Sequence, residues 1–204
     1  MRRAASRRSF AAFGLLFMAT FIIACSPGRN GCEHERACPA VDQSQPLILN
    51  AADGERRLHR PPPGSLSDLT APFILKVDRK NGGAPEFVML TEDIPSGQGI
   101  SPHMHPHSDE ILFIHAGTGL ATLAGRQAVV GAGATIYMPR NTVASLKNTG
   151  PGPLSIVAVF SKPGYEEYLR AISVPEGETP TPLTVDELSA IRARQLDHAV
   201  YSHP

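Results

Sequence analysis

The chain of 204 residues contains no tryptophan, and its other aromatic residues are limited to 8 phenylalanines and 4 tyrosines. An excess of one charge is also absent, because 19 basic residues balance 19 acidic residues. No basic stripe with interleaved aromatic residues occurs along the chain, which argues against nucleic acid as a partner. Glycine and proline are plentiful, with 18 and 19 copies. This composition favours short strands and frequent turns, and the length suffices for one domain with extensions.

Residues 1–24 are predicted to be a signal peptide rather than part of the fold. Their apolar stretch from Phe10 to Ala24 is too short to predict a transmembrane helix. The run from Ile22 to Cys25 resembles the bacterial lipobox, so we expect Cys25 to be lipidated; an uncleaved anchor and an ordinary signal peptide are the alternatives. We therefore expect a membrane-anchored lipoprotein of a bacterial cell envelope, facing the periplasm or the exterior.

The run from Ser6 to Phe10 resembles a twin-arginine export signal, because Arg7 and Arg8 are followed closely by Phe10. Twin-arginine export carries folded proteins, so a metal could be selected before export. Affinity order alone would favour copper or zinc over manganese or iron outside the cytoplasm.

Cys32 and Cys38 remain once Cys25 is assigned to the lipid. In an oxidising compartment a pair at this spacing is expected to form a small disulfide loop. A metal clip with His34 is the alternative. Residues 25–65 are polar and rich in turn signals for much of their length, so we expect a tether or N-terminal extension.

Short apolar runs separated by turn signals fill the rest of the chain and predict an all-β sandwich or barrel over residues 66–162. A C-terminal helical tail is expected over residues 163–204, with a capping box at Thr184 and Glu187. The expected apolar stripe of that last helix is Leu188, Ile191 and Leu196. The strand candidates are 73–77, 87–90, 111–115, 120–123, 128–130, 135–138, 143–146 and 154–160.

Three histidines and a glutamate lie within eight residues, at His103, His105, His107 and Glu110. Imidazole and carboxylate groups are common metal ligands. On a strand, residues i and i+2 point to the same face, so His103 and His105 are expected to present two nitrogens side by side. Glu110 can return from the next strand to add an oxygen.

This run and a second motif resemble those of the cupin family of small jelly-roll barrels. The first motif spans Gly97 to Gly117 around the His-x-His pair and Glu110. The second matches at Gly133, Pro139 and Asn148, with Asn141 at a glycine position, a substitution suited to positive φ. The resemblance implies an all-β cupin jelly-roll β-barrel (a double-stranded β-helix) with a short C-terminal helical extension.

The second motif departs from the family at Ala144, where a third histidine ligand is expected. Three interpretations follow. In the first, a divalent metal (Fe, Mn or Zn) is bound by His103, His105 and Glu110 with open coordination positions. In the second, the missing ligand is replaced by His107 or by His115, although His115 has the parity opposite to Glu110. In the third, the barrel binds an organic ligand, or nothing, without metal. Either Tyr137 or Met138 is expected to fill space near Ala144.

The resemblance also implies a small organic molecule as partner. Apolar side chains are expected to surround it, with Ile111, Phe113, Thr122 and Ile136 as candidates according to which face of each strand points inward. An enzyme of this family would carry out oxygenase-type or decarboxylase-like chemistry. The alternative is a non-catalytic binding or sensing barrel with an incomplete metal site. Cupins often pair through their barrels, which adds a homodimer to the expected partners.

Overall fold

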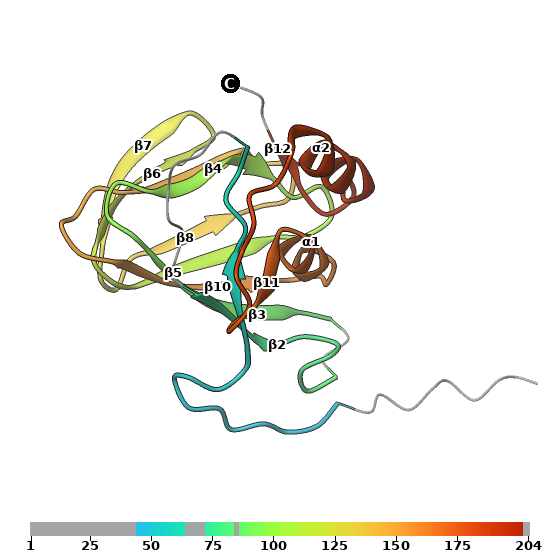
Figure 1. Ribbon diagram of the computed structural model, residues 1–204. Helices are drawn as coiled ribbons and strands as arrows, with labels where there is room; N and C mark the ends of the chain where they lie inside the picture. The colour runs from blue at the N-terminus through green and yellow to red at the C-terminus, as the bar shows by residue number, and fades with distance from the viewer. Residues whose placement is uncertain (1–43, 64–71, 84–85, 202–204) are drawn as a thin grey trace, which may run out of the picture. The chain divides into compact units, whose positions relative to one another are not determined.

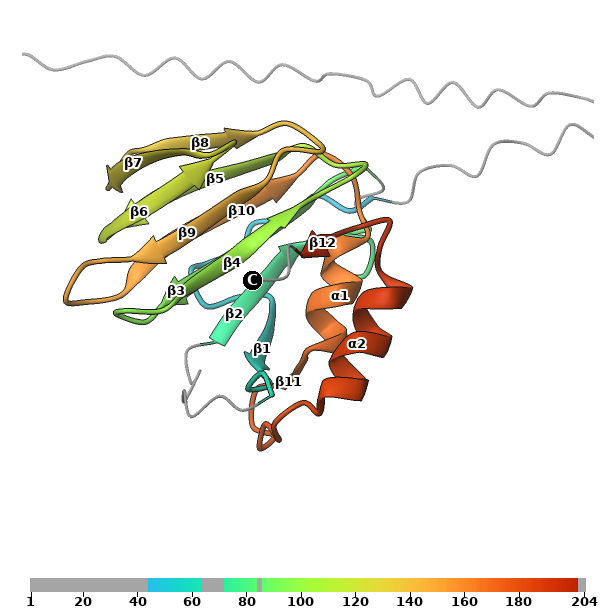
Figure 2. The ribbon, with the colours of Figure 1, turned by 90° about the horizontal axis from the view of Figure 1, so that it is seen from above.

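Two antiparallel β-sheets packed face to face form the body of the protein (Figures 1 and 2). The computed structural model describes residues 44–63, 72–83 and 86–201. The strands are β1 (Glu55–His59), β2 (Pro72–Val77), β3 (Val88–Ile94), β4 (Gly99–Met104), β5 (Glu110–Ala116), β6 (Thr118–Leu123), β7 (Arg126–Gly131), β8 (Thr135–Met138), β9 (Ala144–Asn148), β10 (Leu154–Phe160), β11 (Ser173–Pro175) and β12 (Val200–Tyr201). The helices are α1 (Tyr165–Ala171) and α2 (Val185–Arg194). The predicted all-β class with a short C-terminal helical extension is therefore confirmed.

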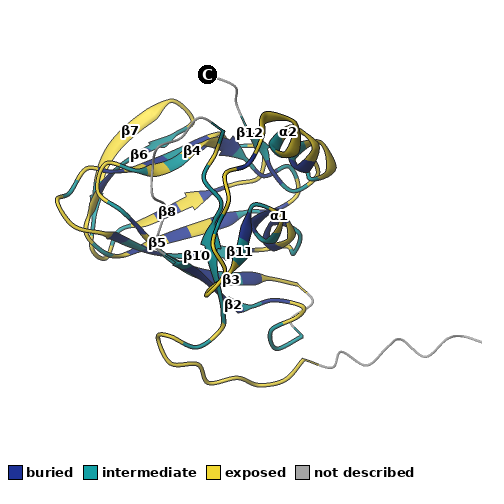
Figure 3. Ribbon diagram, viewed as in Figure 1, coloured by how far each residue is buried: buried dark blue, intermediate teal, exposed yellow. Residues whose placement is uncertain are grey.

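The strand order interleaves distant parts of the sequence, as in a jelly roll. One sheet has the order β11-β1-β2-β3-β10-β5-β8, and the other has the order β12-β4-β9-β6-β7. The two sheets enclose an apolar core between them, and Figure 3 shows buried residues on the facing strands, while the edge strand β7 is mostly exposed. Consecutive strands such as β4 and β5 therefore lie in opposite sheets and face the same core.

Alternation of buried and exposed side chains explains the central strands. In β10 the buried positions run from Leu154 to Phe160 at every second residue. In β5 Leu112 and Ile114 are buried, whereas Ile111 and Phe113 are exposed. The expectation that Ile111 and Phe113 line the cavity is therefore wrong, because successive strand residues point to opposite faces.

Two asparagines of the second motif have structural roles. Asn141 has φ of 62°, the left-handed conformation expected at a glycine position, and its N–H donates to the carbonyl of His105 at 2.9 Å. The side chain of Asn148 is fully buried and donates to the carbonyls of Ile94 and Gly152, both at 2.8 Å. These bonds tie the loops between the sheets to their neighbouring strands.

The sheets extend beyond the predicted barrel boundaries of 66 and 162. Strand β1 lies inside the segment predicted to be a tether, yet it pairs with both β2 and β11. Strand β12 near the C-terminus pairs with β4, with Tyr201 opposite His103. Such short strands are stabilised by pairing with distant strands rather than by their own sequence. The local sequence pattern therefore does not predict them. The signal peptide, Cys25, Cys32 and Cys38 lie outside the described residues.

Helices α1 and α2 lie side by side next to β11 and β12 (Figures 1 and 2). The predicted capping box of α2 is present, since Glu187 N–H donates to the Thr184 hydroxyl and the Thr184 N–H donates to the Glu187 carboxylate. Ile191 is buried as expected, but Leu196 is exposed because α2 ends at Arg194. Within the described ranges, neither helix has the length and apolar character needed to span a membrane.

Arg170 of α1 connects the helix to the first two strands. Its guanidinium forms ion pairs with Glu55 of β1 and with Asp78, which follows β2 and is fully buried. A buried carboxylate needs such a partner, because without one the free-energy cost of removing its charge from water is not offset by any interaction. Arg170 thus fixes α1 against the sheet.

Replacement of Arg170 by Met is expected to lower the free energy of unfolding by about 3–5 kcal/mol, because Asp78 would keep a buried charge without its cation. Urea unfolding followed by circular dichroism measures the change. The matched control is Arg194→Met on α2, an exposed residue whose one side-chain hydrogen bond within the described ranges is to the Ala190 carbonyl of its own helix; its effect should stay within about 0.5 kcal/mol. Equal losses in the two variants would contradict the assigned role of Arg170.

Candidate metal centre

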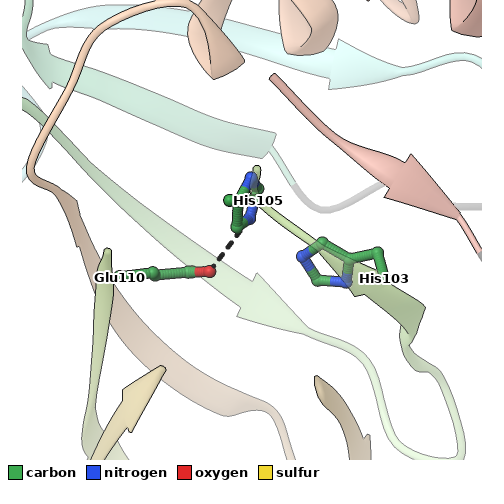
Figure 4. A group of neighbouring side chains, drawn as sticks. All are labelled: His103, His105 and Glu110. Carbon is green, nitrogen blue, oxygen red and sulfur yellow. Dashed lines mark ion pairs between the residues drawn. The ribbon is translucent and has the colours of Figure 1, made fainter. Parts of the chain in front are cut away.

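His103, His105 and Glu110 meet inside the barrel, although they come from opposite sheets. His103 lies in β4, His105 directly follows that strand, and Glu110 is the first residue of β5. Figure 4 shows the three side chains directed at one another. One ligand atom from each residue lies within 4.8 Å of the others. Among the described residues, this is the one group of three or more such side chains close enough to share a metal ion.

All three side chains are almost completely removed from solvent, with exposures of 4% for His103, 4% for His105 and 3% for Glu110. Polar groups are seldom buried in this way without a partner, because each loses its hydrogen bonds to water. The burial therefore requires a partner for the nitrogen and oxygen atoms at the centre of the group.

Backbone carbonyls orient both imidazoles. Nδ1 of His103 lies 2.9 Å from the carbonyl oxygen of Ser101, and Nδ1 of His105 lies 2.6 Å from that of His198. A carbonyl oxygen only accepts, so we assign the ring proton of each neutral histidine to Nδ1. The Nε2 atoms then carry free lone pairs, which is the arrangement that outer hydrogen bonds impose on metal-bound histidines.

Nε2 of His105 and Oε2 of Glu110 face each other without a satisfying partner. They are 3.1 Å apart, close enough for an ion pair, but their geometry is not that of a hydrogen bond. Both atoms are fully buried and lack any hydrogen-bond partner within the described part of the chain. Two electron-rich atoms in this position fit a cation between them. The residues present therefore fit a divalent metal held by two nitrogens and one oxygen.

Burial shifts the protonation of the group toward its uncharged forms. Burial first, and the neighbouring His105 second, lower the pKa of His103 to about 4, while the bond to the Ser101 carbonyl opposes the shift. Burial likewise raises the pKa of Glu110, against the opposing effect of His105. At neutral pH His103 is thus uncharged, the form in which an imidazole can bind a metal.

The two other candidate ligands, His107 and His115, lie outside the group. His107 is exposed in the turn between β4 and β5 and does not belong to the group. His115 is exposed on the outer face of β5, as its parity predicts. Neither residue replaces the missing third histidine.

Ala144 occupies that missing position and lies directly opposite His103 in the pairing of β4 with β9. It is buried beside Met138, and both line a small apolar space of about 10 Å³. Tyr137 points outward and is 54% exposed. Met138 is therefore the residue that fills the space near Ala144.

His103, His105 and Glu110 are called the metal group below. A cavity of about 220 Å³ opens next to them. Sequence reasoning missed many of its residues, because they come from β1, β3 and the C-terminal helices, outside the family motifs. The ring of Tyr201 stacks on His103 at 5.4 Å between centroids, and Tyr165 packs edge-on against His105 at 4.6 Å. The polar residues that line the cavity are His59, Arg60, Glu92, Ser101, His103, Glu110, Tyr165, Tyr168, Arg192 and Tyr201.

In the metal-free protein, the lowered pKa of His103 predicts a loss of stability as the pH falls from about 6.5 to about 4. Within this window the unfolded chain accepts a proton at His103 that the folded chain cannot, which amounts to about 3 kcal/mol. The difference in unfolding free energy between wild type and His103→Gln should change by this amount between pH 7 and pH 4. Parallel pH profiles of the two proteins would show that His103 is not protected from protonation.

Comparison with known proteins gives a family match over the same region. The family model described as "Cupin domain" matches residues 90–160. Mannose-1-phosphate guanylyltransferase 2 of Escherichia coli O157:H7 is 35% identical over 68 residues, which make up 33% of this chain and only 14% of that enzyme. An uncharacterized protein of Methanocaldococcus jannaschii is 37% identical over 70 residues, 34% of this chain and 56% of that protein.

Solved structures with a similar arrangement include two bacterial proteins. A predicted oxalate decarboxylase from Thermotoga maritima aligns with 57% of this chain and 100% of its own, at 18% identity and a TM-score of 0.49. An RmlC-like cupin from Shewanella frigidimarina aligns with 61% of this chain and 98% of its own, at 13% identity and a TM-score of 0.47. The matched segment, 90–160, is similar to a cupin domain and contains the whole metal group.

Proposed function

We propose that this protein is an exported, membrane-tethered cupin that binds a divalent metal at His103, His105 and Glu110 and a small organic molecule in the adjoining cavity. The observation that carries the metal proposal is the pair of buried, unpartnered atoms, His105 Nε2 and Glu110 Oε2, 3.1 Å apart. A divalent cation would neutralise the carboxylate and accept both lone pairs. Iron(II), manganese and zinc all suit two imidazoles and one carboxylate.

Three protein ligands leave positions open for the organic molecule or for oxygen, and a metal so bound acts as a Lewis acid or an activator of oxygen. The chain itself holds the two imidazoles in one tautomer through the carbonyls of Ser101 and His198. The rings of Tyr165 and Tyr201 cover the group, and their hydroxyls lie 3.1 Å apart. Burial raises the pKa of both tyrosines, so both hydroxyls stay protonated; one donates to the other, and the proton of the second can be donated to a bound ligand.

A non-catalytic binding or sensing barrel is the second candidate, and Ala144 favours it. This residue is buried opposite His103, where a third imidazole would complete the metal site. Loss of one ligand weakens metal binding and so favours a barrel whose metal is exchangeable or absent. Metal content therefore discriminates between the two functions.

Protein matured in a bacterial host is expected to contain close to one iron, manganese or zinc ion per chain, located by anomalous diffraction between His105 and Glu110. Glu110→Gln and His105→Ala should each weaken metal binding by more than about a hundredfold, since outer-shell partners alone are worth about 10–100-fold. Titration of the metal-stripped protein with Mn²⁺ or Zn²⁺ measures the affinities.

His107→Ala is the matched control, because this histidine is close in sequence but exposed and outside the group. Its metal affinity should equal that of the wild type. Metal-free protein as isolated, together with unchanged Mn²⁺ and Zn²⁺ affinity in Glu110→Gln, would exclude the metal function and leave the binding barrel.

The proposed tether rests on the lipobox-like run that ends at Cys25 and on the paired Arg7 and Arg8. In a bacterial host, the full chain should label with palmitate and sediment with membranes, and Cys25→Ser should abolish labelling. Cys32→Ser serves as the control, because it removes a cysteine without touching the lipobox. Equal labelling of both variants would contradict lipidation at Cys25.

A further inference from the structure

The cavity beside the metal group has two chemically distinct parts. One part is apolar, formed by Leu112 and Ile156 of the barrel, by Leu183 before α2 and by Leu188 of α2. Several basic residues also line it, and they differ in whether an acid neutralises them. The basic side chains that line the cavity are His59, Arg60, His103 and Arg192.

His59 and Arg60 already have acidic partners. Nε2 of His59 lies 3.2 Å from the Glu92 carboxylate. Arg60 donates to the carbonyl of Thr181 and pairs with Glu187 at 3.2 Å. Neither basic group therefore needs a ligand to satisfy it.

Arg192 differs from both. Its Nε is fully buried without a hydrogen-bond partner, and its guanidinium forms no ion pair in the described ranges. The guanidinium carbon lies 4.6 Å from the centroid of the Tyr201 ring. This stacking holds the planar group in place but leaves its buried Nε–H without an acceptor among the described residues. An arginine fixed in this way is prepared for a planar acceptor such as a carboxylate.

The same Tyr201 ring stacks on His103, so Arg192 and the metal group share an aromatic neighbour and line one cavity. A divalent metal held by two neutral imidazoles and one carboxylate keeps a net charge of about +1. The guanidinium adds a second positive charge. An anionic ligand would balance these charges, whereas a neutral one would leave both uncompensated in a partly apolar cavity.

We propose that Arg192 binds the carboxylate of a small organic acid that occupies this cavity next to the metal group. The inference deepens the proposed function and rests on it for the role of the metal. A carboxylate fits this guanidinium, because its two oxygens match the planar N–H donors in a bidentate pair. The volume of about 220 Å³ restricts the acid to a small one.

Carboxylate binding can be measured by nuclear magnetic resonance titration of the full chain with propionate and benzoate, each compared with its neutral amide and with inorganic phosphate. The wild type should bind at least one carboxylate at least tenfold more tightly than its amide and than phosphate. Arg192→Met should weaken carboxylate binding by roughly tenfold or more, as expected for a lost charge-assisted pair. Arg192→Lys, which keeps the charge but loses the planar fork, should give an intermediate loss.

Arg194→Met is the matched control, since it removes the same charge from the same helix outside this cavity, and its carboxylate affinity should remain that of the wild type. Titrations of metal-stripped and Zn²⁺-loaded protein separate the two proposals. Loss of carboxylate selectivity in Arg192→Met with unchanged zinc affinity supports the role of Arg192 even where the metal proposal fails. Amides or phosphate that bind as well as carboxylates, or Arg192 variants that bind like the wild type, would overturn it.

Discussion

The inward direction of Glu110 at the start of β5 fixes much of this structure, because strand side chains alternate between faces. Once the carboxylate points into the barrel, Leu112 and Ile114 must join the core, and Ile111 and Phe113 must point outward. A shift of one residue would expose the carboxylate and bury the opposite set of side chains. The metal group and the core therefore depend on the same register, which the long pairing of β5 with β10 maintains.

The segments outside the family motifs complete the site. The carbonyl of His198 orients His105, Tyr201 covers His103, and Arg192 reaches the cavity from α2. Arg170 connects the neighbouring helix α1 to β1 and to the loop after β2. The C-terminal region thus acts as one wall of the cavity rather than as a separate appendage.

The absence of a third imidazole links the two proposals made for this site. Ala144 and Met138 fill with apolar atoms the region where another ligand would lie. A metal held by the remaining three side chains would have open positions and incomplete charge neutralisation. The carboxylate proposed to bind Arg192 would add negative charge to the same cavity, so both proposals favour an anionic ligand.

The sequence alone determined the fold class, most strand positions, the capping box at Thr184 and the convergence of His103, His105 and Glu110. These features follow from local rules: alternation along strands, turn residues, capping geometry and the fixed spacing of the cupin motifs. It also predicted the left-handed conformation of Asn141, because few residues other than asparagine replace glycine there. Tertiary structure alone decided that Glu55–His59 forms a strand, that His107 stays outside the group and that Arg192 enters the cavity. Those outcomes depend on contacts between residues that are distant in sequence, so no local pattern along the chain encodes them.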